Sequence, residues 1–191
     1  MTATGTGLTA PALPTPGRWE IDPGHADVSF TGRHFMVTKV RGRFTDVTGA
    51  LTIAEDITRS QVDVVIGMAS VSSGSADRDE HLRSAELFDV ATFPEATFRS
   101  TRVAWGDPGS RAGTVTGDLT IHGVTRSVDL SVRFEGQVRD PWGGVRAVFS
   151  ASTRVNREDF GVTWNVALEA GGLLVSKDIE ITIDVETVLA G

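Results

Sequence analysis

Apolar and polar residues alternate one by one along most of the chain from Arg18 onward. In residues 179–185, isoleucine and valine alternate with acidic residues and threonine, and residues 128–134 repeat the pattern. A period of two places successive side chains on opposite faces of a strand. Strands with one apolar and one polar face are typical of an antiparallel sheet.

The dipeptide His122-Gly123 separates two such runs without a longer connection. A two-residue hairpin loop requires positive φ angles, which glycine adopts freely and histidine tolerates better than most residues. We therefore predict a tight hairpin at this point, with His122 as a turn residue.

One segment, residues 78–86, predicts a short helix. Asp77 followed by Glu80 gives a capping-box-like start. Asp79 and Arg83 have the i,i+4 spacing of an ion pair on an exposed helix face. Beyond this segment, Pro94 marks the return to strand.

About eight to ten strands, tight turns and one short helix indicate an all-β fold. We predict an antiparallel up-and-down β-barrel of about eight strands, because closure removes the edge strands that would otherwise aggregate. A barrel of this size is filled by its own side chains or holds one small ligand. The alternation pattern leaves both open.

The chain has 191 residues, enough for one domain of this kind. Residues 1–17 are rich in Thr, Ala, Gly and Pro and are predicted to form a flexible N-terminal leader, followed by a single barrel domain over residues 18–191. The leader lacks the charged and apolar regions of a secretory signal, which favours a soluble, cytoplasmic protein unless a signal has been removed. The net charge of −7 argues against a nucleic-acid partner.

Recognisable catalytic signals are missing from the sequence. There is no cysteine, no G-x-S-x-G elbow, no P-loop and no HExxH, and no two of the four histidines have i,i+3 or i,i+4 spacing. We therefore predict no metal, no cofactor and no enzymatic activity.

The four histidines instead lie in separate short motifs. These read IDPGH ending at His25, HFMV starting at His34, RDEHL over residues 78–82, and GDLTIHG over residues 117–123. With Trp19-Glu20, GRF at 42–44, FRS at 98–100, and Arg157 followed by DFG at 159–161, they resemble the YceI family over residues 18–188. The resemblance implies a lipocalin-like barrel that binds polyisoprenoids or related amphiphiles.

On this basis we expect a long-chain isoprenoid, isoprenoid quinone or fatty-acyl compound as partner. Its polar head is predicted to meet His34, Arg78 and His81. Its tail is predicted to contact apolar side chains that face inward from the strands, although each of these positions also fits ordinary core packing: Val28, Phe30, Val64, Ile66, Phe98, Phe149, Trp164 and Ile181.

Two alternatives stay open at this point. The histidines could serve a lipid- or quinone-modifying enzyme, or the barrel could be solid and belong to a stress or interaction protein. Membrane contact is expected to be transient at most, with Trp142 either touching lipid or standing as an ordinary loop aromatic. Self-association as a homodimer is also left open.

Overall fold

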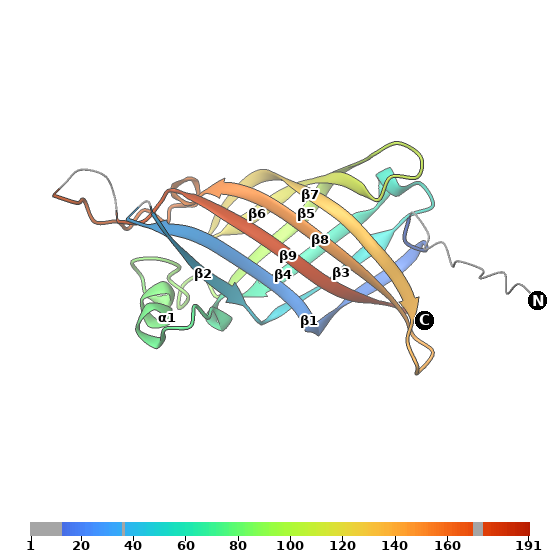
Figure 1. Ribbon diagram of the computed structural model, residues 1–191, viewed down its shortest axis with the longest axis horizontal. Coiled ribbons are helices and arrows are strands. Elements are labelled where there is room, and N and C mark those ends of the chain that lie inside the picture. The colour runs from blue at the N-terminus through green and yellow to red at the C-terminus, as the bar shows by residue number, and fades with distance from the viewer. Residues whose placement is uncertain (1–12, 36, 170–173) are drawn as a thin grey trace, which may run out of the picture.

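The computed structural model describes residues 13–35, 37–169 and 174–191, and Figure 1 shows them as a single barrel. Alternating sequences form its long antiparallel strands. The nine strands are β1 (Gly17–His34), β2 (Thr38–Phe44), β3 (Val47–Ile53), β4 (Gln61–Gly67), β5 (Glu95–Trp105), β6 (Ala112–Ile121), β7 (Val124–Arg139), β8 (Val145–Asn156) and β9 (Asp178–Leu189).

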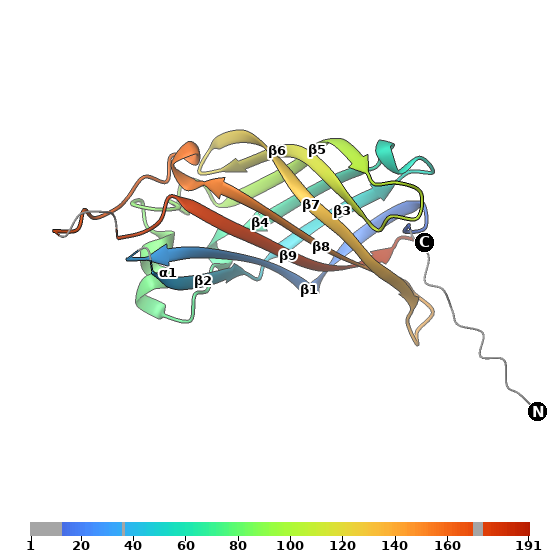
Figure 2. The same ribbon diagram turned by 45° about the horizontal axis from the view of Figure 1, so that its top comes forward.

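The strands follow one another around the barrel from β3 to β9, and β9 pairs with β1 to close it. The other edge of β1 pairs with β3 along Gly17–Glu20 and with β2 along Val28–His34. Because β2 and β3 pair with successive parts of the same edge of β1, they share one place in the barrel. The nine strands therefore form an eight-stranded barrel. The prediction of a closed antiparallel barrel of about eight strands is confirmed (Figure 2).

The helix is correctly placed in the chain, but its start and its side-chain contacts differ from the prediction. Helix α1 spans Ala76–Arg83, with Ser75 as its N-terminal cap residue. The Asp79 carboxylate accepts hydrogen bonds from the backbone N–H and hydroxyl of Ser73. Arg83 donates to the carbonyls of Ala69 and Val71 at 2.9 and 2.8 Å. The predicted Asp79–Arg83 pair is therefore wrong: both side chains fasten α1 to the preceding segment.

The predicted hairpin at His122-Gly123 is confirmed. The two residues have φ angles of 52° and 71°, and Ile121 pairs directly with Val124 across the turn. The His122 ring packs against Phe93, with centroids 4.6 Å apart.

One end of the barrel is closed by its own side chains. Trp19 and Phe134 are completely buried there, within a cluster that includes Ile53 and Ala147. The indole N–H of Trp19 donates to the Thr15 carbonyl at 2.9 Å, so the segment just before β1 is fastened to this end. Residues 1–12 of the predicted leader lie outside the described residues. In the described part of the chain, no helix is long and apolar enough to span a membrane.

Candidate functional site

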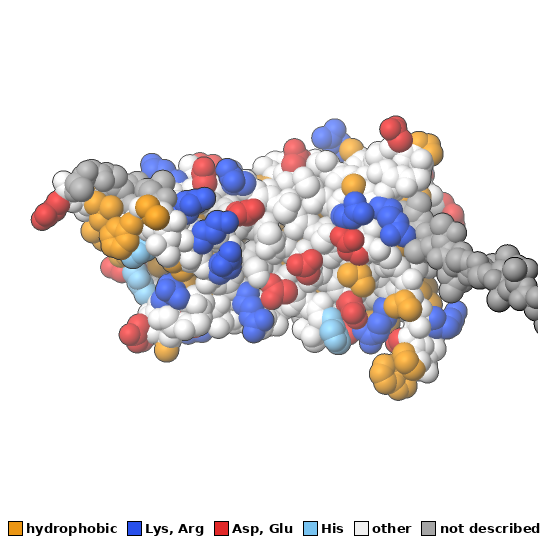
Figure 3. Space-filling model, in the orientation of Figure 1, with side chains coloured by type: hydrophobic (Ala, Val, Ile, Leu, Met, Phe, Trp, Pro, Cys, Tyr) orange, Lys and Arg blue, Asp and Glu red, His pale blue; other side chains and the backbone are white. Residues whose placement is uncertain are grey.

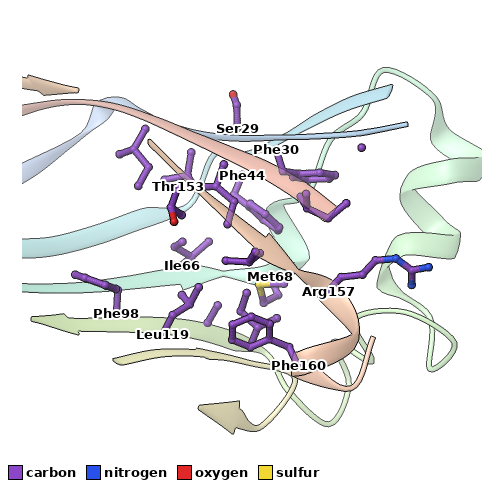
Figure 4. A pocket seen from close by; sticks show the side chains of 18 of the residues that line it. Ser29, Phe30, Phe44, Ile66, Met68, Phe98, Leu119, Thr153, Arg157 and Phe160 are labelled. Atoms are coloured by element: carbon purple, nitrogen blue, oxygen red, sulfur yellow. The ribbon is translucent and has the colours of Figure 1, made fainter. Parts of the chain in front are cut away.

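The barrel encloses a cavity of about 440 Å³ between its closed end and α1. Its walls are the inward-facing side chains of the strands, which are almost entirely apolar (Figure 4). Arg33 and Arg78 line the cavity and are also exposed to solvent, so the cavity reaches the surface at the α1 end. This end, bounded by α1, the β1–β2 turn and the segment before β9, is called the mouth below.

The size of the cavity fits a ligand. Small-molecule pockets commonly measure ~300–1,000 Å³. A cavity of ~150 Å³ holds one benzene ring, so this space corresponds to very roughly 15–20 carbon atoms. The barrel is therefore not solid.

All eight residues predicted to meet an apolar tail line this cavity: Val28, Phe30, Val64, Ile66, Phe98, Phe149, Trp164 and Ile181. They come from β1, β4, β5, β8, β9 and the segment that follows β8. Phe149 belongs to the cluster at the closed end, whereas Trp164 contacts His81 of α1 at the mouth. The structure thus brings these side chains into one space; their contact with a ligand stays a prediction.

Two aromatic rings lie along the wall because the neighbouring strand offers a glycine beneath each. Phe30 on β1 pairs with Gly42 on β2, where a Cβ atom would stand 2.4 Å from the ring. Phe98 on β5 lies likewise over Gly117 on β6. Because neither glycine has a side chain, the end of each ring can lie over the neighbouring strand, and both phenylalanines line the cavity.

The three residues predicted to meet a polar head also lie together, at the mouth. His34 ends β1, and Arg78 and His81 lie on α1; all three line the cavity. Arg78 donates from Nε and Nη2 to the hydroxyl and carbonyl of Ser73, both at 2.8 Å. His81 Nε2 lies 2.8 Å from a carboxylate oxygen of Glu86. Arg78 and His81 thus already have protein partners, and their predicted role in head-group binding stays a prediction.

Arg157 is a cavity residue that was not included in the predicted site. It is only 7% exposed and follows the inward-facing positions Ala151, Thr153 and Val155 of β8 at the same spacing of two. Burial lowers the pKa of its guanidinium from the ordinary value. The continuing alternation, with a cation where an apolar residue is expected, was the signal available in the sequence.

The other two histidines lie away from the cavity lining. His25 lies in the part of β1 where the register with β9 shifts, and His122 is in the β6–β7 turn. Asp22, His25 and Glu186 form a group with metal-ligand chemistry in the described residues. Arg146 Nη1, however, lies 2.7 Å from Asp22 and 3.1 Å from Glu186, so a guanidinium already occupies the space between the two carboxylates.

The mouth also carries exposed apolar side chains. Phe35 and Val37 in the β1–β2 turn are 52% and 76% exposed, and Val166 is 45% exposed. The backbone N–H of Phe35 donates to the Leu174 carbonyl, and that of Leu174 to the Val166 carbonyl, which ties these segments together. Figure 3 shows orange side chains gathered at this end of the molecule, with basic side chains on the adjoining surface. Trp142, 86% exposed, lies in the β7–β8 loop at the opposite end (Figure 1).

Comparisons with known proteins agree with this architecture. A UPF0312 protein of Vibrio parahaemolyticus is 40% identical over 139 residues, which span 72% of each chain. The crystal structure of BcnA from Burkholderia cenocepacia matches with a TM-score of 0.74 at 21% identity, covering 87% of this chain and 98% of that one.

A polyisoprenoid binding domain from Saccharophagus degradans has the same fold, with a TM-score of 0.66 at 16% identity, covering 92% of this chain and all of that one. The YceI-like domain model matches residues 19–187, nearly the whole barrel. The chain therefore belongs to the YceI-like family.

Proposed function

We propose that the protein binds one long-chain amphiphile, a polyisoprenoid, isoprenoid quinone or fatty-acyl compound, with its tail inside the barrel. The observation that carries this proposal is the apolar cavity of about 440 Å³, closed at one end and open at the other. A blind apolar tube accepts a flexible chain but offers few directional contacts for a small polar substrate. The polyisoprenoid binding domain named above has the same fold, which supports the proposal.

The energetics allow useful affinity without specific contacts to the tail. Burial contributes about 0.8 kcal/mol per CH₂ group, so about 15 carbons give on the order of 12 kcal/mol. Lost translational and chain freedom offsets roughly 4–15 kcal/mol of this. Tail burial thus supplies most of the affinity, and polar groups at the mouth set the choice of head group.

We further propose that cargo enters at the mouth during brief contact with a lipid surface. Phe35, Val37 and Val166 would touch the lipid, and the exposed basic residues Arg33, Lys39 and Arg41 flank them on β1 and β2. Each clustered cation near the surface favours binding to anionic lipid by about 1 kcal/mol. This supports attachment of the mouth to such a membrane, although the protein as a whole has a net negative charge. Binding and transfer require no bond-making step, so the proposal is a carrier rather than an enzyme.

The direct test is native mass spectrometry of the purified protein, followed by organic extraction and analysis of the extract. We expect one long-chain species per chain, or stoichiometric uptake of added polyprenyl or fatty-acyl compounds. The variant Ala151→Phe, which places a ring in the cavity, should bind substantially less. Its control is Ser152→Phe, because Ser152 is the next residue on β8 and is exposed on the outside. Equal binding by both variants, or no binding by the wild type, would refute the carrier.

A further inference from the structure

The guanidinium of Arg157 is held by backbone carbonyls on two sides and left without a partner on the third. Nε donates to the Ser176 carbonyl at 3.0 Å, and Nη1 donates to the Val162 carbonyl at 2.6 Å. Nη2 is buried and has no hydrogen-bond acceptor within the described residues. Buried donors nearly always have a partner, and an unsatisfied one costs roughly 1–3 kcal/mol.

The guanidinium also forms no ion pair in the part of the chain that the structure describes. In the described ranges, no carboxylate lies within ion-pair distance of Arg157. Glu158, the adjacent residue in the chain, is paired with Lys177 at 2.8 Å. Two carbonyl oxygens orient a guanidinium but do not neutralise it, and burying a charge without a counter-charge is strongly unfavourable.

The position of Arg157 connects this missing anion with the cavity. Its side chain belongs to the cavity wall and extends from the apolar interior toward α1 (Figure 4). A tail that enters from the mouth would leave its head group at this level, beside the free Nη2. Nη2 is thus shielded from solvent and still lacks an acceptor.

We infer that Arg157 recognises the head group of the cargo and that this head group is an oxyanion, a carboxylate or a phosphate. The inference rests on the proposed carrier function and adds the chemical class of its ligand. An uncharged alcohol or quinone would supply an acceptor to Nη2 but not the missing negative charge. Charge-assisted hydrogen bonds from arginine to an oxyanion are about twice as strong as neutral ones.

The first test compares pairs of ligands with the same chain on the wild-type protein by isothermal titration calorimetry. The pairs are dodecanoate with dodecanol and farnesyl phosphate with farnesol. We expect the anion of at least one pair to bind about tenfold tighter or more than its alcohol, and the pair with the larger ratio identifies carboxylate or phosphate.

Equal affinities within both pairs, or tighter binding of the alcohols, would overturn the inference and leave the carrier intact. If no member of either pair binds, both proposals fail. This comparison needs no variant and therefore does not depend on whether a substituted protein folds.

The second test assigns the preference to Arg157. We expect Arg157→Gln to bring the affinity ratio of anion to alcohol close to one, while Arg157→Lys keeps most of it. Arg154→Gln is the control, because Arg154 lies three residues earlier and is exposed on the outer face of β8. A purely architectural arginine would weaken both ligands equally and leave the ratio unchanged, which would contradict the assignment.

Discussion

At the scale of single residues, the space inside the barrel depends on how large side chains lie against the wall. Phe30 and Phe98 are aromatic residues on the inward face, and each could fill the centre. Instead, the far end of each ring lies over a glycine of the neighbouring strand, Gly42 or Gly117, where a Cβ atom would stand 2.4 Å from the ring. Glycine in a strand often marks such a close approach.

The contact between the Phe30 ring and Gly42 leads to a prediction for the variant Gly42→Ala. The added methyl group would collide with the Phe30 ring and turn it into the cavity, so tail binding should weaken by about tenfold while the fold survives. The double variant Gly42→Ala with Phe30→Leu, which removes the ring that collides, should recover much of the affinity. Titration with a fatty-acyl ligand measures both. Unchanged binding by Gly42→Ala would show that the ring does not control the space.

At the scale of elements, β1 is a single long strand that changes partner halfway. Its register with β9 shifts between Ile21 and Ala26. The Asp22 carboxylate accepts from the Gly24 N–H at 3.0 Å and pairs with Arg146 of β8 at 2.7 Å. Arg146 also contacts Asp140 and Glu186, so one guanidinium fixes the irregular part of β1 to its neighbours.

The hydrogen bond from Arg146, followed by those from His25 and Gly24, lowers the pKa of Asp22 to about 2. A carboxyl group with a lowered pKa stabilises the fold above its unfolded value near ~3.9. That contribution is lost as the pH falls from about 4 to about 2. Because Asp22 is partly exposed, we expect it to amount to only about 1–2 kcal/mol.

Asp22→Asn should therefore be less stable at pH 7 and should lose less stability than the wild type between pH 4 and pH 2. Urea unfolding across this range measures the difference. Asp63→Asn is the matched control, because the Asp63–Arg99 pair is largely exposed and should contribute little. Parallel pH profiles for the wild type and Asp22→Asn would contradict the role of Asp22.

At the scale of the whole molecule, the two ends of the barrel differ. One end is sealed by Trp19 and Phe134, and the other carries the opening, α1 and an exposed apolar rim. Under the proposed function, cargo would enter and leave at the open end. The proposed lipid contact lies at the end opposite Trp142, which the sequence left either as a lipid contact or as an ordinary loop aromatic.

Replacing Phe35 and Val37 together by serine should slow cargo uptake from lipid vesicles severalfold, because less apolar surface can enter the lipid. Equilibrium affinity for a soluble short-chain ligand should change little. Stopped-flow transfer from vesicles with anionic lipid measures the rate. Trp142→Ser is the control, since Trp142 is more exposed but lies at the sealed end. A larger loss of rate with Trp142→Ser would place the lipid contact there instead.

Much of this protein follows from local sequence. Alternation with a period of two determines the strands and the faces that point inward, as β7 and β9 show, and the positive φ at His122-Gly123 determines one hairpin. These features depend on neighbours in the chain, so a single sequence contains them. The family motifs and the inward row of apolar residues were visible for the same reason.

The tertiary structure alone decided what the inward faces enclose. Whether Phe30 fills the barrel depends on Gly42, which approaches it only after two strands pair. Likewise, the isolation of the Arg157 charge appears only when Ser176 and Val162 fold around it and Glu158 turns to Lys177. The volume of the cavity and the compensation of a buried charge both depend on residues that are far apart in the sequence. The local pattern determines which way each side chain points, but it does not determine the volume left empty inside the barrel or the net charge buried there.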